Sequence, residues 1–341
     1  MQLQKPGQLD GKRLVEVDIS PVDPAADEVL IEVDACAVCR TDLQIVTGDL
    51  RSRRLPIVPG HQVVGRITAV GSEIVPKRIG SSVGLAWLAN ACQVCRFCQS
   101  GRENLCENAQ FTGWDIDGGY ASHVLAKGDY AFDLPTAEDG SDPRTTKERA
   151  ASLAPLLCGG TIGYRSLRIA EIDAGSAGAR LGLFGYGASA TLVLQLARFW
   201  GCDVYVVTRS ADEAERALEA GAKWAGTYDQ VLPVKLDAAI TFAPAGNVVI
   251  DALRATDRGG IVAVNAIHLD RMPEFNYDDL WLERSIRSVA NVTRQDVREF
   301  LDLVPRAGIT TTFETLDLSQ ANVALQRLQD GDVRGSFVLT G

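Results

Sequence analysis

Short apolar segments separated by glycine and proline dominate the first 135 residues of the chain. Residues 29–34 (VLIEVD) are apolar and end in alternation with polar positions, and residues 63–71 (VVGRITAVG) form a similar segment closed by glycine. Such short apolar runs are typical of strands that are buried on one or both faces. The pattern predicts a small, barrel-like β domain in this part of the chain.

From about Ala150 onward, strand-like and helix-like segments alternate. The predicted segments are strands at 181–184, 204–207, 236–242 and 261–264 and helices at 190–200 and 212–220. Strands that alternate with helices in this order indicate parallel βαβ units. The C-terminal tail returns to one predicted helix at 319–330 and a last strand at 336–340.

Length and composition describe a globular protein of two domains. The 341 residues exceed one typical domain, and a hydrophobic content of 46% is enough to bury a full core. The net charge of −10 argues against nucleic acid as a partner, because a polyanion needs a basic surface. No apolar stretch approaches the roughly 20 residues of a membrane helix, and residues 1–12 lack an apolar signal core. We therefore expect a cytoplasmic protein that does not enter membranes.

Four of the eight cysteines lie within fifteen residues, at Cys92, Cys95, Cys98 and Cys106. Clustered cysteines in a cytosolic chain more often hold metal than form disulfides. The two-residue spacings let successive sulfurs face one point, as a closed structural zinc site of four thiolates requires. The net charge of −2 in such a site would be offset by backbone N–H groups or by Arg96 and Arg102.

A glycine-rich turn lies between the predicted strand 181–184 and the helix that follows. The residues G-Y-G-A-S-A at 185–190 fit the pattern G-x-G-x-x-A of dinucleotide-binding turns. Gly185 would make the tight turn, and Gly187 would let a pyrophosphate approach the helix N-terminus. A turn without a ligand is the alternative.

The end of the next strand indicates which dinucleotide is preferred. NAD sites usually place Asp or Glu there to bind the ribose 2′-hydroxyl. This strand ends instead in Thr208, Arg209 and Ser210, with no carboxylate at that end. An arginine and two hydroxyls suit a 2′-phosphate, so the sequence predicts a preference for NADP(H) over NAD(H).

Two further segments bring cysteine, histidine and a carboxylate together. Residues 36–42 read C-A-V-C-R-T-D, and residues 59–62 read P-G-H-Q. Taken alone, the cysteines fit a redox pair, a structural metal clip or part of an active site. We expect Cys36 to be a buried small residue rather than a ligand.

Together, these motifs resemble the zinc-dependent alcohol dehydrogenases of the medium-chain dehydrogenase/reductase superfamily. The resemblance covers almost the whole chain, and the motifs occur in the family's order. Residues 39–42 (C-R-T-D), 60–61 (G-H) and 158–161 (C-G-G-T) look like the segments around the family's catalytic zinc, and residues 92–106 look like its structural zinc lobe.

The resemblance implies an α/β fold of two domains. Residues 1–160 plus 289–341 would form a β-rich, GroES-like catalytic domain that carries the lobe at 92–106. Residues 161–288 would form a Rossmann domain with a doubly wound parallel sheet. A homodimer or homotetramer is also implied, with two zinc ions per chain.

The resemblance assigns the catalytic zinc to Cys39, His61 and Cys158. Three protein ligands leave the fourth position to water or substrate, and the ion would lower the pKa of a bound alcohol. Thr41 would hydrogen-bond the substrate oxygen and pass on its proton. Asp42 would accept the second N–H of His61 and so fix its tautomer.

Two residues are assigned to the cofactor by the same resemblance. Arg40 would bind the pyrophosphate, and Thr161 would lie near the nicotinamide, with helix capping as the alternative for Thr161. The implied reaction is reversible hydride transfer between NAD(P) and a small-molecule primary alcohol or its aldehyde, with secondary alcohols as a further class.

The chain departs from the family pattern at two places near the implied zinc. The family usually has Gly-His-Glu where this chain has Gly60-His61-Gln62, and Gln44 occupies a position where many members carry histidine. Gln62 stays a candidate catalytic residue, because its amide oxygen could still approach the zinc weakly. Gln44 cannot act as a base, so a proton would leave through water or the cofactor ribose. None of these changes removes an implied zinc ligand.

Rival interpretations follow from the same residues. Within the superfamily, a polyol dehydrogenase commonly uses a carboxylate ligand, and a quinone reductase lacks zinc. A different class is a non-catalytic, zinc- and nucleotide-binding redox sensor, favoured by the absent histidine and glutamate and by Cys36. Trp87 and Trp114 suit either an apolar substrate pocket or plain core.

Overall fold

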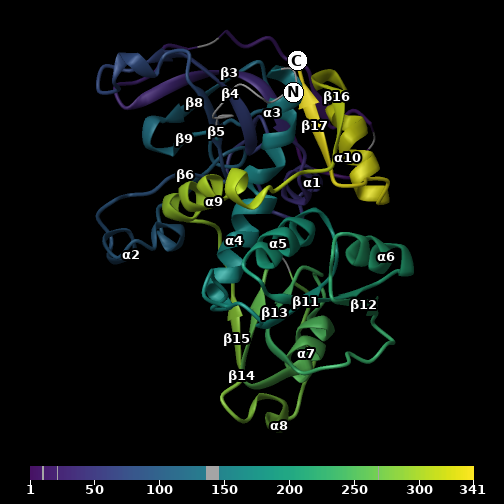
Figure 1. The fold of residues 1–341 in the computed structure, drawn as a ribbon. Helices are drawn as coiled ribbons and strands as arrows, with labels where there is room; N and C mark the ends of the chain where they lie inside the picture. The colour runs from purple at the N-terminus through teal and green to yellow at the C-terminus, as the bar shows by residue number, and fades with distance from the viewer. Residues whose placement is uncertain (10, 21, 136–145, 268) are drawn as a thin grey trace. The chain divides into compact units, whose positions relative to one another are not determined.

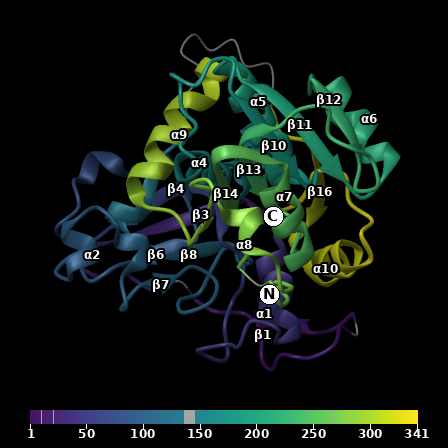
Figure 2. The same ribbon diagram turned by 90° about the horizontal axis from the view of Figure 1, so that it is seen from below.

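The computed structural model describes the chain except for residues 10, 21, 136–145 and 268. The chain divides into two compact units (Figures 1 and 2). Unit 1 contains Met1–Cys158, Asn291–Asp302 and Thr310–Gly341, and unit 2 contains Gly159–Ala290 and Leu303–Ile309. Among the described residues, every helix is too short or too polar to cross a membrane.

Unit 1 is built on a seven-stranded sheet with the order β16-β17-β3-β4-β5-β9, to which β8 is added through β3. Its strands are β3 (Glu28–Ala37), β4 (Gln62–Val70), β5 (Ser82–Leu85), β8 (His123–Lys127), β9 (Ala131–Asp133), β16 (Phe313–Asp317) and β17 (Ser336–Thr340). The predicted strands at 29–34, 63–71 and 336–340 are confirmed. β3 continues three residues past the predicted end, because Ala35, Cys36 and Ala37 are all buried in the sheet.

The C-terminal strand completes this sheet. β17 pairs in parallel with β16 and antiparallel with the end of β3, where Val338 lies opposite Ala37 (Figure 1). Phe337, Val338 and Leu339 are buried in the core of unit 1. The β domain predicted from the first 135 residues is therefore closed by residues from the other end of the chain.

Unit 2 is a parallel sheet with the strand order β12-β11-β10-β13-β14-β15. Its strands are β10 (Arg180–Phe184), β11 (Asp203–Thr208), β12 (Trp224–Thr227), β13 (Leu236–Thr241), β14 (Thr256–Val264) and β15 (Ser285–Ser288). Its helices are α4 (Gly159–Ile169), α5 (Ala188–Phe199), α6 (Ala211–Glu219), α7 (Gly246–Ala255) and α8 (Tyr277–Leu280). The strand order reverses between β10 and β13, which is the switch point where doubly wound sheets bind ligands.

The predicted βαβ alternation is confirmed in unit 2, and two of its strands were not predicted. β12 and β15 are four-residue strands at the two edges of the sheet, and both are only partly buried. Short edge strands lack the continuous apolar run of a buried strand, so their sequences carry a weak signal.

The remaining helices and strands are not part of the two large sheets. The helices are α1 (Arg40–Thr47), α2 (Arg96–Gln99), α3 (Thr146–Leu153), α9 (Arg294–Ala307) and α10 (Ala321–Asp330), and the strands are β1 (Gln2–Leu3), β2 (Leu14–Val15), β6 (Leu88–Asn90) and β7 (Gln110–Phe111). Single-turn 3₁₀ helices occur at Pro76–Arg78, Glu103–Leu105, Gly128–Tyr130, Ala154–Leu157 and Leu318–Gln320.

Because β17 completes the sheet of unit 1, shortening one of its buried side chains should lower the stability of this unit. Val338→Ala should lower the free energy of unfolding of unit 1 by about 2 kcal/mol, because Val338 is fully buried. Val323→Ala, on the exposed side of α10, is the matched control and should cost about 0.5 kcal/mol or less. Chemical denaturation followed by fluorescence measures both, and equal costs for the two variants would contradict the closing role.

Candidate active site

Cys39, His61 and Cys158 come together in unit 1. Their sulfur and nitrogen ligand atoms all lie within 4.8 Å of one another. Cys39 lies two residues after the end of β3 and caps α1, and His61 directly precedes β4. Because β3 and β4 are antiparallel, with Ala37 opposite Gln62, the residues just outside this pair are necessarily neighbours. Cys158 directly follows the 3₁₀ helix Ala154–Leu157.

The Asp42 carboxylate holds Cys39 and His61 in position through hydrogen bonds. One oxygen lies 2.9 Å from His61 Nδ1 and accepts a 3.2 Å hydrogen bond from the Gly60 N–H, and the other accepts a 2.8 Å bond from the Cys39 N–H. Both Asp42 and His61 are completely buried. A carboxylate at Nδ1 fixes the histidine tautomer and leaves Nε2 available as a ligand.

The histidine Nε2 supports a metal at this point. Nε2 is buried and has no hydrogen-bond partner among the described residues. A buried polar atom without a partner costs free energy, so such atoms usually mark a missing ion or water. Two sulfurs and one imidazole nitrogen are the donor set that a catalytic zinc uses, with a fourth position left open. The residues present therefore fit the ion that the sequence implies.

The pKa values of Cys39, His61 and Cys158 in the absence of metal are all shifted by their neighbours. Burial acts to lower the pKa of His61, but Asp42 and Cys39 more than reverse this and raise it to about 10. A hydrogen bond between the two thiols lowers the pKa of Cys39 well below its usual value and raises that of Cys158. A divalent ion that binds here would displace the protons that these groups hold.

Gly60 explains why His61 can take this position. Its φ angle is +97°, and a Cβ atom there would lie 2.4 Å from the Tyr120 ring and 2.8 Å from the Cys36 sulfur. Only glycine fits both the angle and the space. Cys36 is buried against this turn, as expected, and is not part of the three-residue group.

The other residues predicted near the metal are also buried. The Thr41 Oγ1 lies 3.8 Å from the Cys39 sulfur, and the Gln62 amide donates a 3.4 Å hydrogen bond to the Ala37 carbonyl. Trp87 meets the His61 ring edge-on, with centroids 4.9 Å apart. Trp87 also stacks on Phe111 and Trp114, so an aromatic cluster adjoins the imidazole.

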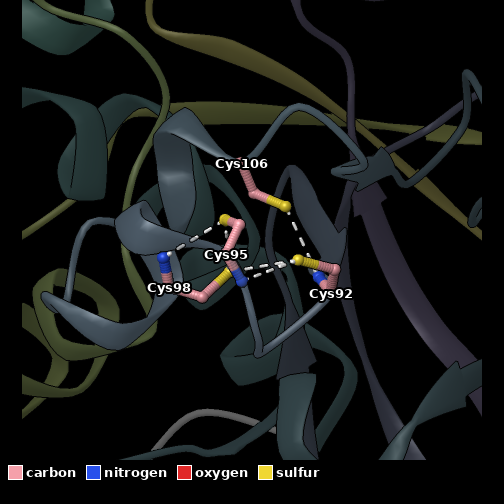
Figure 3. A group of neighbouring side chains, drawn as sticks. All are labelled: Cys92, Cys95, Cys98 and Cys106. Carbon is pink, nitrogen blue, oxygen red and sulfur yellow. Dashed lines mark hydrogen bonds between the residues drawn. The ribbon is translucent and has the colours of Figure 1, made fainter.

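The sulfurs of Cys92, Cys95, Cys98 and Cys106 face one point (Figure 3). Cys92 and Cys98 have sulfurs 3.9 Å apart, and Cys95 and Cys98 have sulfurs 3.5 Å apart. Four sulfurs held tetrahedrally at zinc would lie about 3.8 Å from one another. All eight cysteines of the chain are free of disulfides.

Backbone N–H groups, rather than arginines, face these sulfurs. The N–H groups of Cys92, Cys95 and Cys98 donate to sulfurs of the cluster at 3.4–3.5 Å. Backbone donors lower the pKa of Cys92 to about 6, whereas burial and the neighbouring sulfurs raise that of Cys98 to about 12. Arg96 and Arg102, offered by the sequence as charge partners, instead lie over the Phe97 ring.

Arg294, in the first turn of α9, anchors the lobe to the rest of unit 1. Its guanidinium reaches the buried carboxylate of Glu103 at 3.4 Å, Gln93 at 2.9 Å and Asp129 at 3.1 Å, and it lies over the Tyr130 ring. These partners are 165 to 201 residues away in sequence. The sequence pattern therefore carried no signal for this role.

In unit 2, the glycine turn connects β10 to α5 as the sequence predicts. Gly185 has φ +97°, and its N–H donates a 2.7 Å hydrogen bond to the Val207 carbonyl. Gly187 caps α5, and a Cβ atom at Gly187 would meet nothing within 4 Å. The turn thus leaves open space at a helix N-terminus, beside the end of β11.

Thr208, Arg209 and Ser210 occupy the end of β11, but a carboxylate reaches them from α6. Glu213 accepts a hydrogen bond from the Thr208 hydroxyl and another from Arg209 Nε at 3.3 Å. As expected, β11 itself carries no carboxylate at this end. The expectation that the strand end lies away from any carboxylate is wrong, because Glu213 reaches it from the next helix. The sequence signal was available in S-x-x-E at 210–213, a capping-box pattern that places Glu213 in the first turn of α6.

The two remaining predicted cofactor residues lie in different units. Arg40 is exposed at the first residue of α1 in unit 1, whereas Thr161 is buried in α4 of unit 2. Their roles toward a cofactor stay predictions.

Comparison with known proteins gives matches along most of the chain. The model of the alcohol dehydrogenase GroES-like domain matches residues 25–136, and that of the zinc-binding dehydrogenases matches residues 190–306. A probable alcohol dehydrogenase AdhA of Mycobacterium tuberculosis is 43% identical over 99% of this chain and 96% of its own. The chain belongs to the zinc-binding alcohol dehydrogenase family.

A second curated relative and a solved structure are also similar to the chain along most of its length. An alcohol dehydrogenase of Geobacillus stearothermophilus is 30% identical over 92% of this chain and 91% of its own length. The structure of acetophenone reductase from Geotrichum candidum, in complex with NAD, superposes with a TM-score of 0.83 at 25% identity, covering 100% of this chain and 97% of its own. The redox-sensor alternative finds no support among these relatives.

The anchoring role of Arg294 predicts a local effect of its removal. Arg294→Ala should speed amide hydrogen exchange of residues 92–106 and lower stability by about 1–3 kcal/mol, because Glu103 keeps its charge in a buried position without its cation. Mass-spectrometric hydrogen exchange measures the effect. Arg306→Ala, an exposed arginine of the same helix, is the control and should leave the lobe unchanged. Unchanged exchange in both variants would contradict the anchoring role.

Proposed function

We propose that the chain is a zinc-dependent alcohol dehydrogenase that transfers hydride reversibly between a primary alcohol and a nicotinamide cofactor, with NADP(H) favoured. Secondary alcohols are a further substrate class. The observation that carries the proposal is the convergence of Cys39, His61 and Cys158 around the unpartnered His61 Nε2. When bound there, zinc would act as a Lewis acid on the alcohol oxygen.

The chain's own residues orient this chemistry. Asp42 holds the imidazole and the Cys39 backbone, so that the two ligands keep their positions without substrate. The Thr41 hydroxyl is buried beside Cys39 and, in this proposal, would hold the proton that leaves the alcohol. Gln62 is engaged with the Ala37 carbonyl and adds no charge to the site. Trp87 and its stacked neighbours provide an apolar wall suited to an alcohol carbon chain.

The second proposed zinc is structural. Cys92, Cys95, Cys98 and Cys106 would fill all four positions of the ion, which leaves none for a substrate. The backbone N–H groups that face the sulfurs would offset the charge of the thiolates.

The cofactor is proposed to bind unit 2 at the glycine turn. Its pyrophosphate would approach Gly185 and Gly187, and Arg209 would meet the 2′-phosphate of NADP(H). Ser210 lies at the same strand end. Arg40 and Thr161 are proposed to contact the pyrophosphate and the nicotinamide, as the family resemblance implies.

We assign residues 1–160 and 289–341 to the catalytic domain and 161–288 to the cofactor domain. The two compact units divide the chain close to these boundaries, between 158 and 159 and between 290 and 291, except that Leu303–Ile309 groups with unit 2. A homodimer or homotetramer is proposed from the family alone.

Metal analysis tests the centre on which the proposal depends. The purified protein should contain two zinc ions per chain, and His61→Ala should retain one and lose turnover. Asp42→Asn should weaken metal binding at one site by roughly 10- to 100-fold, because an amide presents a donor where the carboxylate accepts from N–H groups. Asp49→Asn, at an exposed carboxylate just beyond α1, should bind both ions normally. Two tightly held ions in Asp42→Asn, or turnover without metal, would contradict the assignment.

A panel of alcohols and aldehydes with both cofactors tests the cofactor preference. We expect a higher kcat/KM with NADP than with NAD. Arg209→Gln should lower kcat/KM for NADP at least about tenfold with little effect on NAD, because a charge-assisted bond to phosphate is lost. Lys223→Gln is the control, because Lys223 lies just before β12 and its side chain pairs with Asp203 at the opposite end of β11. A clear preference for NAD that Arg209→Gln leaves unchanged would refute the cofactor assignment.

A further inference from the structure

One carboxylate occupies the place where the two dinucleotides differ. Glu213 is in the first turn of α6, and its side chain is 15% exposed, whereas that of Arg209 is 78% exposed. The carboxylate accepts a hydrogen bond from Thr208, which is completely buried at the end of β11. Its other oxygen accepts from Arg209 Nε at 3.3 Å.

The position of Glu213 is not explained by helix capping alone. Ser210 caps α6, and its hydroxyl accepts the Glu213 N–H at 3.2 Å. In a full capping box, the glutamate would return to the Ser210 N–H. Here the carboxylate turns instead to the strand end, where it meets two of the groups that the sequence assigned to a 2′-phosphate.

This strand end adjoins the glycine turn. The Gly185 N–H donates to the carbonyl of Val207, the residue before Thr208. In doubly wound dinucleotide domains, the adenosine ribose of a cofactor that crosses such a turn reaches the end of the neighbouring strand. A carboxylate there can accept a hydrogen bond from a ribose 2′-hydroxyl and repels a 2′-phosphate.

We propose that Glu213 is a specificity-determining residue that favours NAD(H) and limits the gain that Arg209 gives to NADP(H). It acts in two ways: its charge opposes the 2′-phosphate, and it engages the guanidinium that would bind that phosphate. The proposal rests on the proposed binding of a dinucleotide at the glycine turn, but not on which dinucleotide the unaltered chain prefers. Thr208 positions the carboxylate and does not itself meet the cofactor.

The test measures cofactor binding as well as turnover. Dissociation constants for NADH and NADPH are determined by calorimetry, together with kcat/KM for both, for the unaltered chain, Glu213→Gln and Glu213→Ala. Both variants should shift the ratio of NADPH to NADH affinity at least about tenfold toward NADPH, the change expected when a charge is removed beside a phosphate. Asp212→Asn removes the same charge from the adjacent, more exposed position and should shift the ratio less than about twofold.

A double-variant cycle separates the two ways in which Glu213 acts. If the carboxylate works partly through Arg209, the gain in NADPH affinity from Glu213→Gln should shrink in the Arg209→Gln background. A lower melting temperature with an unchanged affinity ratio in both Glu213 variants would show a purely structural role and overturn the proposal. Failure of the chain to bind either cofactor would instead refute the proposed function, and a native preference for NADH with the expected shift would refute only the NADP preference.

Discussion

The proposed metal centre depends on one buried carboxylate that joins two strand ends. Asp42 accepts hydrogen bonds from the backbone on either side, at Cys39 and Gly60, and from the ring of His61. A buried charge is tolerated only when its acceptor sites are filled by donors, and here three donors fill them. The same bonds that satisfy Asp42 therefore fix the cysteine and the histidine relative to each other.

The two cysteine-containing sites differ in the groups that face their ligand atoms. In the lobe at 92–106, backbone N–H groups face the sulfurs, and the nearby arginines stack on an aromatic ring instead. In the three-residue site, two cysteines and an imidazole lie together, and the imidazole is held by the buried Asp42 carboxylate. The first arrangement suits an ion that stays in place, and the second suits one whose surroundings change charge during a reaction.

The buried strands, the cysteine cluster and the glycine turn could be predicted from the sequence because their signals are local, whereas the grouping of Cys39, His61 and Cys158 followed only from the family resemblance. Cys92 to Cys106 form a spacing pattern, and the strand at 29–34 is an apolar run. The roles of Arg294 and Glu213 could not be predicted in the same way. The partners of Arg294 lie far away in sequence, and the direction of the Glu213 side chain is decided by Thr208 rather than by its own helix. Edge strands such as β15 were missed because a half-exposed strand lacks a continuous apolar signal.

The order of the strands in unit 1 has a consequence for biosynthesis. β17 leaves the ribosome only after the whole of Gly159–Ala290 has been made, yet it forms the neighbour of β3 in the N-terminal sheet. Until then, the nascent sheet has an open edge at the end of β3, around Cys36 and Ala37, and open edges invite pairing with other chains. The second unit can fold before β17 has been made, whereas the sheet of the first unit cannot be completed until then. A chaperone that shields the unfinished sheet would therefore act on the first unit, even though its N-terminal segments are synthesised first.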